Sequence, residues 1–181
     1  AGKMVVDHLR AAGHQSIAHL THDRYDVARH SGIGPHYDAW EMFRGYEQTM
    51  LSSGLTPVLI THPLRLTGGF SQSCYESGYA SLRSIMAHPA KPSAVFCYND
   101  DQAYGLIQAC HDEGIAVPDR LAIVGYGDEK LARIIRPRLT TLRRPSRETG
   151  RRASELLLRM IEKETVESVT LEPELMVRES A

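Results

Sequence analysis

Short, mostly apolar runs alternate with longer helix-like segments along most of the chain, and this rhythm limits the fold more than any single residue does. The runs are SIAHL (16–20), PVLIT (57–61), SAVFCY (93–98) and LAIVGY (121–126). Strands without polar alternation suit a parallel sheet that is covered on both faces. We therefore predict an α/β fold in which helices flank a parallel sheet on both sides.

Helix-like segments fill the spaces between these runs. Apolar spacing predicts helices over residues 5–12, 38–54, 74–88 and 101–113. The polar, glycine-containing stretch 21–37 is predicted to be a loop. The rhythm then changes, and the last part of the chain is predicted to hold a strand at LTTL (139–142), a long helix over 147–164 and a strand within SVTLEPELMVRES (168–180).

The composition excludes several classes of protein. The chain has 181 residues, 42% hydrophobic and 24% charged, as in a globular domain with a real core. Its net charge of −1 lacks the basic excess of a DNA-binding domain. No apolar run approaches the roughly 20 residues of a membrane span, and the N-terminal residues lack the order of a signal peptide. We expect a soluble, unexported chain with no membrane partner.

The cysteines also indicate a protein that is not exported. Cys74, Cys97 and Cys110 are odd in number and form no CxxC pair, so neither a disulfide framework nor a zinc site is predicted. Reduced thiols fit a cytoplasmic location. Residue 1 is not methionine and Met4 already lies in a helical pattern, so we expect a piece of a longer protein.

The stretch AVFCYNDDQAYGLIQAC (94–110) places an amide and two carboxylates where a strand meets a helix. Three interpretations compete: a helix cap, a catalytic or metal-binding acidic pair, and the polar rim of a small-molecule pocket. Adjacent carboxylates at a helix start point in different directions, which disfavours catalysis. The chain also has no GxSxG elbow, and GYGDEK (125–130) lacks a phosphate-loop pattern. We predict neither an enzyme nor a cofactor.

Histidine spacing raises the question of a metal. His22, Asp26 and His30 are four residues apart in turn, so they would share one face of a helix, with His36 nearby. The glycines and proline of 32–35 instead indicate a loop with solvated histidines, so no metal site is predicted.

Several segments of the sequence, taken in order, resemble the motifs of one known protein family. The segments FRGYEQTMLSSGL, GGFSQSCYESGYASLRSIM, PSAVFCYNDDQAYGLIQACHDEGIAVPDRLAIVGYGD, RPRLTTLRRPSRETGRRASELLLRMIE and LEPELMVRES follow one another as in the effector-binding core of LacI/GalR-type transcription regulators. The resemblance covers nearly the whole chain. It implies a periplasmic-binding-protein-like fold of type I, with two subdomains, three crossing strands and a small-molecule cleft.

Carried over by position, the resemblance divides the chain. Residues 1–138 match the C-terminal subdomain of the effector-binding core. Residues 139–181 match crossing strands and a helix that complete the N-terminal subdomain, most of which is missing here. Its absence would leave Leu156, Leu157, Leu158 and Ile161 without their natural partner, which favours dimerisation or swapping.

The resemblance also implies ligand-binding positions. Phe70 follows TGG, where the residues alone allow either a core aromatic or an exposed ring; the family has an aromatic there that stacks on the effector. Asn99 matches an amide that can accept from and donate to a polyol or a base. Asp100 is expected to order its loop by capping.

Two predicted ligand positions depart from the family. The family's GYDD reads GYGD here, so Gly127 replaces the first acid and only Asp128 remains. Met42 lies three residues before Gly45, where the family commonly has an arginine that clamps the ligand. Arg44 is displaced by about 200° around a helix, so it cannot substitute for that arginine.

These observations predict the ligand-sensing and dimerisation part of a LacI-type regulator. The expected partners are a sugar-like or nucleobase-like effector, a second copy of the chain, and operator DNA through an N-terminal domain outside this chain. An exported sugar-binding protein of a transporter, which shares the fold, is the alternative.

Overall fold

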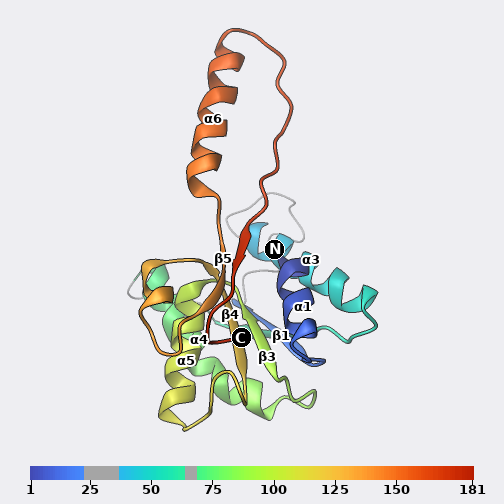
Figure 1. Cartoon of the computed structure of the whole chain (residues 1–181), viewed down its shortest axis with the longest axis vertical. Coiled ribbons are helices and arrows are strands. Elements are labelled where there is room, and N and C mark those ends of the chain that lie inside the picture. The colour runs from blue at the N-terminus through green and yellow to red at the C-terminus, as the bar shows by residue number, and fades with distance from the viewer. Residues whose placement is uncertain (23–36, 64–68) are drawn as a thin grey trace.

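The computed structural model describes residues 1–22, 37–63 and 69–181, and its centre is one six-stranded sheet (Figure 1). The strands are β1 (Ile17–His22), β2 (Val58–His62), β3 (Ala94–Cys97), β4 (Ala122–Gly127), β5 (Thr140–Arg143) and β6 (Glu174–Met176). They lie in the order β2-β1-β3-β4-β5-β6. All neighbours are parallel except β5 and β6, which pair antiparallel. The predicted α/β class is confirmed.

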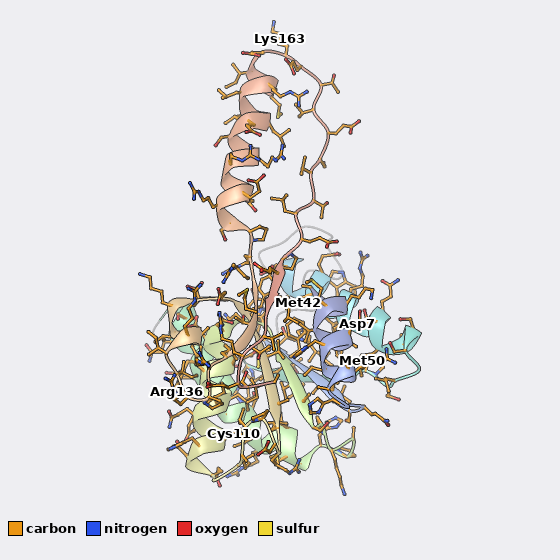
Figure 2. All side chains as sticks on the ribbon, in the orientation of Figure 1. Asp7, Met42, Met50, Cys110, Arg136 and Lys163 are labelled. Atoms are coloured by element: carbon orange, nitrogen blue, oxygen red, sulfur yellow. The ribbon has the colours of Figure 1, made fainter. Side chains whose placement is uncertain are left out.

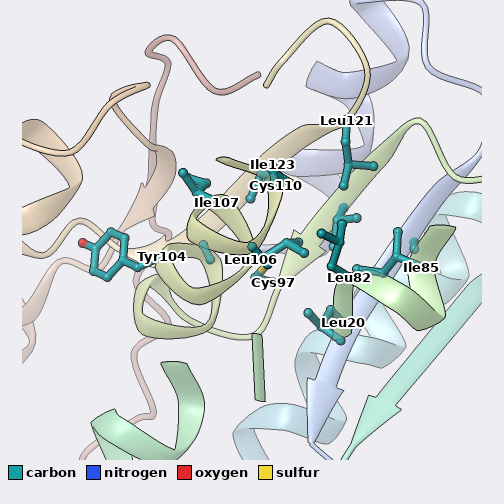
Figure 3. Packing of buried hydrophobic residues seen from close by; sticks show 14 of the residues in the cluster. Leu20, Leu82, Ile85, Cys97, Tyr104, Leu106, Ile107, Cys110, Leu121 and Ile123 are labelled. Carbon is teal, nitrogen blue, oxygen red and sulfur yellow. The ribbon is translucent and has the colours of Figure 1, made fainter. Parts of the chain in front are cut away.

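Helices cover both faces of this sheet. On one face, α1 (Gly2–Ala11) and α3 (Tyr37–Ser52) enclose a core with Val6, Phe96 and Val124. On the other face, α4 (Phe70–Ala87) and α5 (Asp100–Asp112) enclose a second core with residues such as Leu20 and Ile123 (Figure 3). Strands β1 and β3 are buried along their whole length, and β4 over its first four residues, which explains their mostly apolar sequences.

Helices α4 and α5 approach each other unusually closely, and two glycines permit it. A Cβ atom at Gly78 would lie 1.9 Å from the carbonyl oxygen of Gln102, and one at Gly105 would lie 1.9 Å from that of Tyr75. Each glycine therefore forms a notch for the backbone of the other helix.

Some predicted boundaries were wrong. Helix α4 begins at Phe70 and not at residue 74. The prediction missed its first four residues because residues 71–73 are polar and do not continue the apolar spacing. Gly69, with φ of +97°, ends the preceding loop. Within the predicted strand 168–180, only Glu174–Met176 pairs with a neighbour. The predicted loop over 21–37 begins with the last two residues of β1 and ends with the first residue of α3, and 23–36 lies outside the described residues.

One long extension, which we call the arm (residues 144–173), projects from the carboxyl end of the sheet (Figure 1). It consists of helix α6 (Ser146–Ile161) and the chain that returns to β6. No residue of α6 is buried, and its side chains spread around a helix that stands clear of the sheet (Figure 2). Leu157, Leu158 and Ile161 are 58%, 62% and 68% exposed, so a wide apolar surface is uncovered in this chain.

A buried histidine gives the first core a pH dependence. His19 lies on β1 between Phe43, Tyr46 and Phe96, and its Nδ1–H donates to the carbonyl oxygen of Phe96 at 3.0 Å. Within the described residues its Nε2 has no partner. Burial lowers the pKa of His19 to about 4, which the hydrogen bond to Phe96 opposes only in part.

We therefore expect His19→Phe to change the pH dependence of stability. In the wild type the unfolded state takes up a proton near pH 6.5 and the folded state only near pH 4, so folding stability falls as the pH falls through this window. The loss amounts to about 3 kcal/mol between pH 7 and pH 4. Urea unfolding of both proteins measures it, because titrations that they share cancel in the difference. Parallel pH curves would contradict a neutral buried His19.

Candidate functional site

A cavity of about 560 Å³ opens at the carboxyl ends of the parallel strands, where α/β sheets collect their ligands. Its wall comes from the start of α3, the starts of α4 and α5, the loop after β4 and the end of β5. Among the predicted ligand residues, Met42, Phe70 and Asn99 line this cavity, and so does Asp100. The structure therefore brings together residues that are far apart in the sequence.

Phe70 and Tyr98 form an aromatic corner of the cavity. Phe70 is the first residue of α4 and is 44% exposed, so it is not a core aromatic. Its ring meets that of Tyr98 at 6.4 Å with an angle of 78° between the planes. Tyr98 is only 8% exposed, so the Phe70 ring is the main apolar surface that can border a flat or ring-shaped ligand.

Asn99 caps helix α5. Its Oδ1 accepts a hydrogen bond from the backbone N–H of Gln102 at 2.9 Å, which satisfies one of the free donors at the helix start. A hydrogen bond from its amide to Cys74 partly offsets the burial that raises the pKa of that thiol to about 11. The amide nitrogen carries a second hydrogen, which is the group left to donate to a ligand.

Asp100 orders a loop, as expected, but it does not do so by capping its own helix. Its Oδ2 accepts from the backbone N–H of Glu129 at 2.8 Å and its Oδ1 from the hydroxyl of Thr141 at 2.5 Å. Burial raises the pKa of Asp100 to about 6 despite both hydrogen bonds. Because Asn99 already occupies the cap, this carboxylate connects α5 to β5 and to the loop after β4.

Asp128 and Gly127, both predicted to bind ligand, do not line this cavity. The Asp128 carboxylate is 1% exposed and accepts from Arg143 at 2.8 Å, from Arg133 at 2.9 Å and from Arg178. Burial raises the pKa of Asp128, but the hydrogen bonds from the three arginines outweigh it and bring the pKa below its usual value. This carboxylate ties β5 and the C-terminal segment to the loop after β4.

The glycine in GYGD has a physical explanation. Gly127 has φ of +147°, and a Cβ atom there would lie 3.2 Å from Oδ2 of Asp100. A second carboxylate at this position would strain the backbone and crowd a buried acid.

Asp38 and Tyr98 are site residues that the sequence reasoning missed. The Tyr98 hydroxyl donates to Oδ2 of Asp38 at 2.6 Å across the cavity wall. Asp38 adjoins the stretch predicted to be a loop, and Tyr98 was assigned only to a strand. An aromatic residue directly before Asn99, at the end of a buried strand, was the available signal.

The histidine group does not form a metal site in the described part of the chain, where no three suitable side chains cluster. His22 is buried on β1, with its ring 4.9 Å from that of Tyr98. Asp26, His30 and His36 lie outside the described residues. In the same described ranges, no helix combines the length and apolar composition of a bilayer crossing.

The fold and the cavity are those of an α/β protein with a pocket at the carboxyl edge of its sheet. Comparison with known families shows to which family the chain belongs. Residues 6–181 match the model of the periplasmic binding protein-like domain, and the chain belongs to this family. Its relatives are LacI-family repressors, as the resemblance implied. None of these relatives is an enzyme, in agreement with the prediction.

Two curated relatives illustrate the match. The ribose operon repressor of Escherichia coli (strain K12) is 35% identical over 139 residues, which are 76% of this chain and 40% of that protein. The HTH-type transcriptional repressor PurR of Vibrio campbellii (strain ATCC BAA-1116) is 30% identical over 177 residues, 96% of this chain and 51% of the repressor. The chain thus spans about half the length of these relatives, or less.

Solved structures share the fold. A LacI family transcriptional regulator from Enterococcus faecium with bound ribose aligns with 99% of this chain and 61% of its own, at a TM-score of 0.79 and 22% identity. The Lac repressor bound to ONPG in its repressed state aligns with 99% of this chain and 50% of its own, at a TM-score of 0.81 and 22% identity.

Proposed function

We propose that this chain is the ligand-sensing part of a LacI-type transcription regulator and that its cavity forms one wall of the effector site. The observation that supports this function best is the cavity at the carboxyl edge of the sheet, which carries an aromatic corner and the Asn99 amide. The effector is a small sugar-like or nucleobase-like metabolite, because both combine a flat or apolar face with polar edges.

The remaining parts of the proposed regulator follow from its relatives. Residues 1–138 act as the C-terminal subdomain, and residues 139–181 supply crossing strands and the helix of a second subdomain. The protein works in the cytoplasm as a homodimer, whose operator contacts come from a domain outside this chain. The reported relatives are repressors, which favours this function over an exported sugar-binding protein.

Effector binding would act by favouring one angle between the two subdomains. The ligand can shift this equilibrium only by its difference in affinity for the two states. Asp100 is suited to such a role, because it lines the cavity and also accepts from Thr141 on β5, the strand that leads to the arm.

A ligand screen tests the proposal. Sugars, nucleosides and bases are added to the chain, and thermal shift and two-dimensional ¹H–¹⁵N NMR report binding, since a ligand bound only by the native state raises the Tm. We expect a ligand that perturbs the amides around residues 70 and 99 and whose affinity falls at least about tenfold in Phe70→Ala, from loss of ring stacking.

Matched variants control this screen. Tyr75→Ala removes a comparably exposed aromatic ring from the same helix, outside the cavity, and should leave the affinity unchanged. Asn99→Ser retains a capping oxygen but loses the amide donor, so it separates ligand contact from helix stability. A ligand indifferent to Phe70 and Asn99, or no ligand in these classes, would contradict the proposed site.

A further inference from the structure

Only some of the charged side chains that line the cavity have a charged or hydrogen-bonding partner in the cavity wall. Among the described residues, four carboxylates line it, those of Asp38, Asp100, Asp101 and Glu129, against two cations, Lys130 and Arg144. Asp100 is buried and accepts two hydrogen bonds, and Glu129 lies 3.5 Å from the guanidinium of Arg144. Within the part of the chain that the structure describes, this leaves Asp38 and Asp101 as lining carboxylates without an ion pair, and Lys130 as the cation without one.

One wall of the cavity already holds a cation between a ring and a carboxylate. The guanidinium carbon of Arg144 lies 5.5 Å from the centre of the Tyr126 ring, and the same guanidinium pairs with Glu129. A cation over an aromatic face is attracted by the electrons of the ring, and a neighbouring carboxylate adds to this attraction.

The aromatic corner also combines a carboxylate with aromatic rings, but in the described ranges this carboxylate forms no ion pair with a cation. Asp38 is exposed and accepts one hydrogen bond from Tyr98, whose ring meets that of Phe70. The residue beside them on α3 is Met42, which is 7% exposed and carries no charge. Asp38 and the Phe70 ring therefore line a cavity in which no side chain among the described residues forms an ion pair with Asp38.

We infer that the effector of the function proposed above carries a positively charged amino group, which binds between the Asp38 carboxylate and the rings of Phe70 and Tyr98. An amino sugar has this chemistry, because it joins an ammonium group to a ring with an apolar face. An acidic sugar is disfavoured at this corner, since Met42 offers no positive charge and Asp38 repels a carboxylate.

Helix starts normally attract anions, but here they do so unequally. Asp100 and Asp101 lie in the first turn of α5 and offset its positive end. The first turn of α4 has no acidic residue, so its free backbone N–H groups can donate to a ligand hydroxyl. A ligand with its amine toward Asp38 and its hydroxyls toward α4 satisfies both sides.

Matched sugars test the inference on the 181-residue chain. Glucosamine, glucose and glucuronate, and their galacto counterparts, are titrated at a pH where the amine is protonated, and ¹H–¹⁵N NMR gives each Kd. We expect the amino sugar to bind about tenfold more tightly than the neutral sugar and the uronate to bind most weakly. Asp38→Asn should remove this preference, so that the amino sugar and the neutral sugar bind with similar affinity. Added salt should reduce the preference.

Glu76→Gln is the control, because Glu76 is an exposed carboxylate on α4 outside the cavity. The preference for the amine should persist in this variant. A uronate that binds as tightly as the amino sugar, or a preference that survives Asp38→Asn, would overturn the inference and leave the sensor role intact. If no sugar binds, the inference is overturned, and the sensor role then depends on the nucleosides and bases of the ligand screen.

Discussion

Gly105→Ala should destabilise the protein by about 3 kcal/mol, the upper range for a side chain forced into a packed interior. The new Cβ atom would lie 1.9 Å from the carbonyl oxygen of Tyr75 and 2.8 Å from the backbone nitrogen of Tyr79. These neighbours are backbone atoms of α4, so the clash cannot be relieved by rotating a side chain. Helices α4 and α5 must move apart, and the core between them and the sheet loses contacts.

Urea unfolding followed by circular dichroism measures this loss, and Gly45→Ala is the matched control. Gly45 lies within helix α3, which packs on α1, yet the nearest atom to its added Cβ is 3.8 Å away, an ordinary contact. Because alanine favours helices, Gly45→Ala should keep or raise stability, by up to about 1 kcal/mol. Equal stability of Gly105→Ala and the wild type would show that the helices are not packed as described.

Asp128→Asn should also cost about 3 kcal/mol, the scale found when one partner of a buried ion pair is removed. The neutral amide cannot compensate the charges of Arg133, Arg143 and Arg178, and it replaces an acceptor oxygen with a donor group. The effect should be largest where the carboxylate connects β5, the C-terminal segment and the loop after β4. In the variant, amide hydrogen exchange should therefore speed up more in these segments than in α1 and α3.

Glu174→Gln provides the comparison, since Glu174 also pairs with Arg143 but its side chain is 68% exposed. Its loss should change stability by less than about 1 kcal/mol. The pKa of Asp128 is lowered in the fold, so its contribution is present above the unfolded pKa and disappears as the pH falls through the folded value. The difference between wild type and Asp128→Asn should thus shrink in acid; a constant difference would contradict an ionised Asp128.

Local pattern accounts for most of the fold that could be predicted. Four strands with little polar alternation and the helices between them are visible in the sequence, because burial on both faces leaves an apolar run. The start of α4 was missed since its first turn lines a cavity and has no apolar face to show. Local pattern thus fails where residues serve a site.

Residues of the site could be predicted only where a short stretch of the sequence is enough to place them at the cavity. Asn99 follows a buried strand and could be placed at the carboxyl edge of the sheet. The contact of Tyr98 with Asp38 spans 60 positions and that of Asp128 with Arg178 spans 50, and no local pattern reports such pairs. Asp128 was thus assigned to the ligand, whereas its carboxylate is engaged by arginines.

The strand β5 belongs to two parts of the molecule at once. Thr141 on this strand donates to Asp100 in the cavity wall, and two residues later Arg143 pairs with Glu174, at the point where the chain enters and leaves the arm. A molecule that fills the cavity and a molecule that covers the arm therefore act on the same strand. Thermodynamic linkage makes such influence reciprocal: if cavity filling favours one arm angle, an arm fixed at that angle must tighten cavity binding by the same factor.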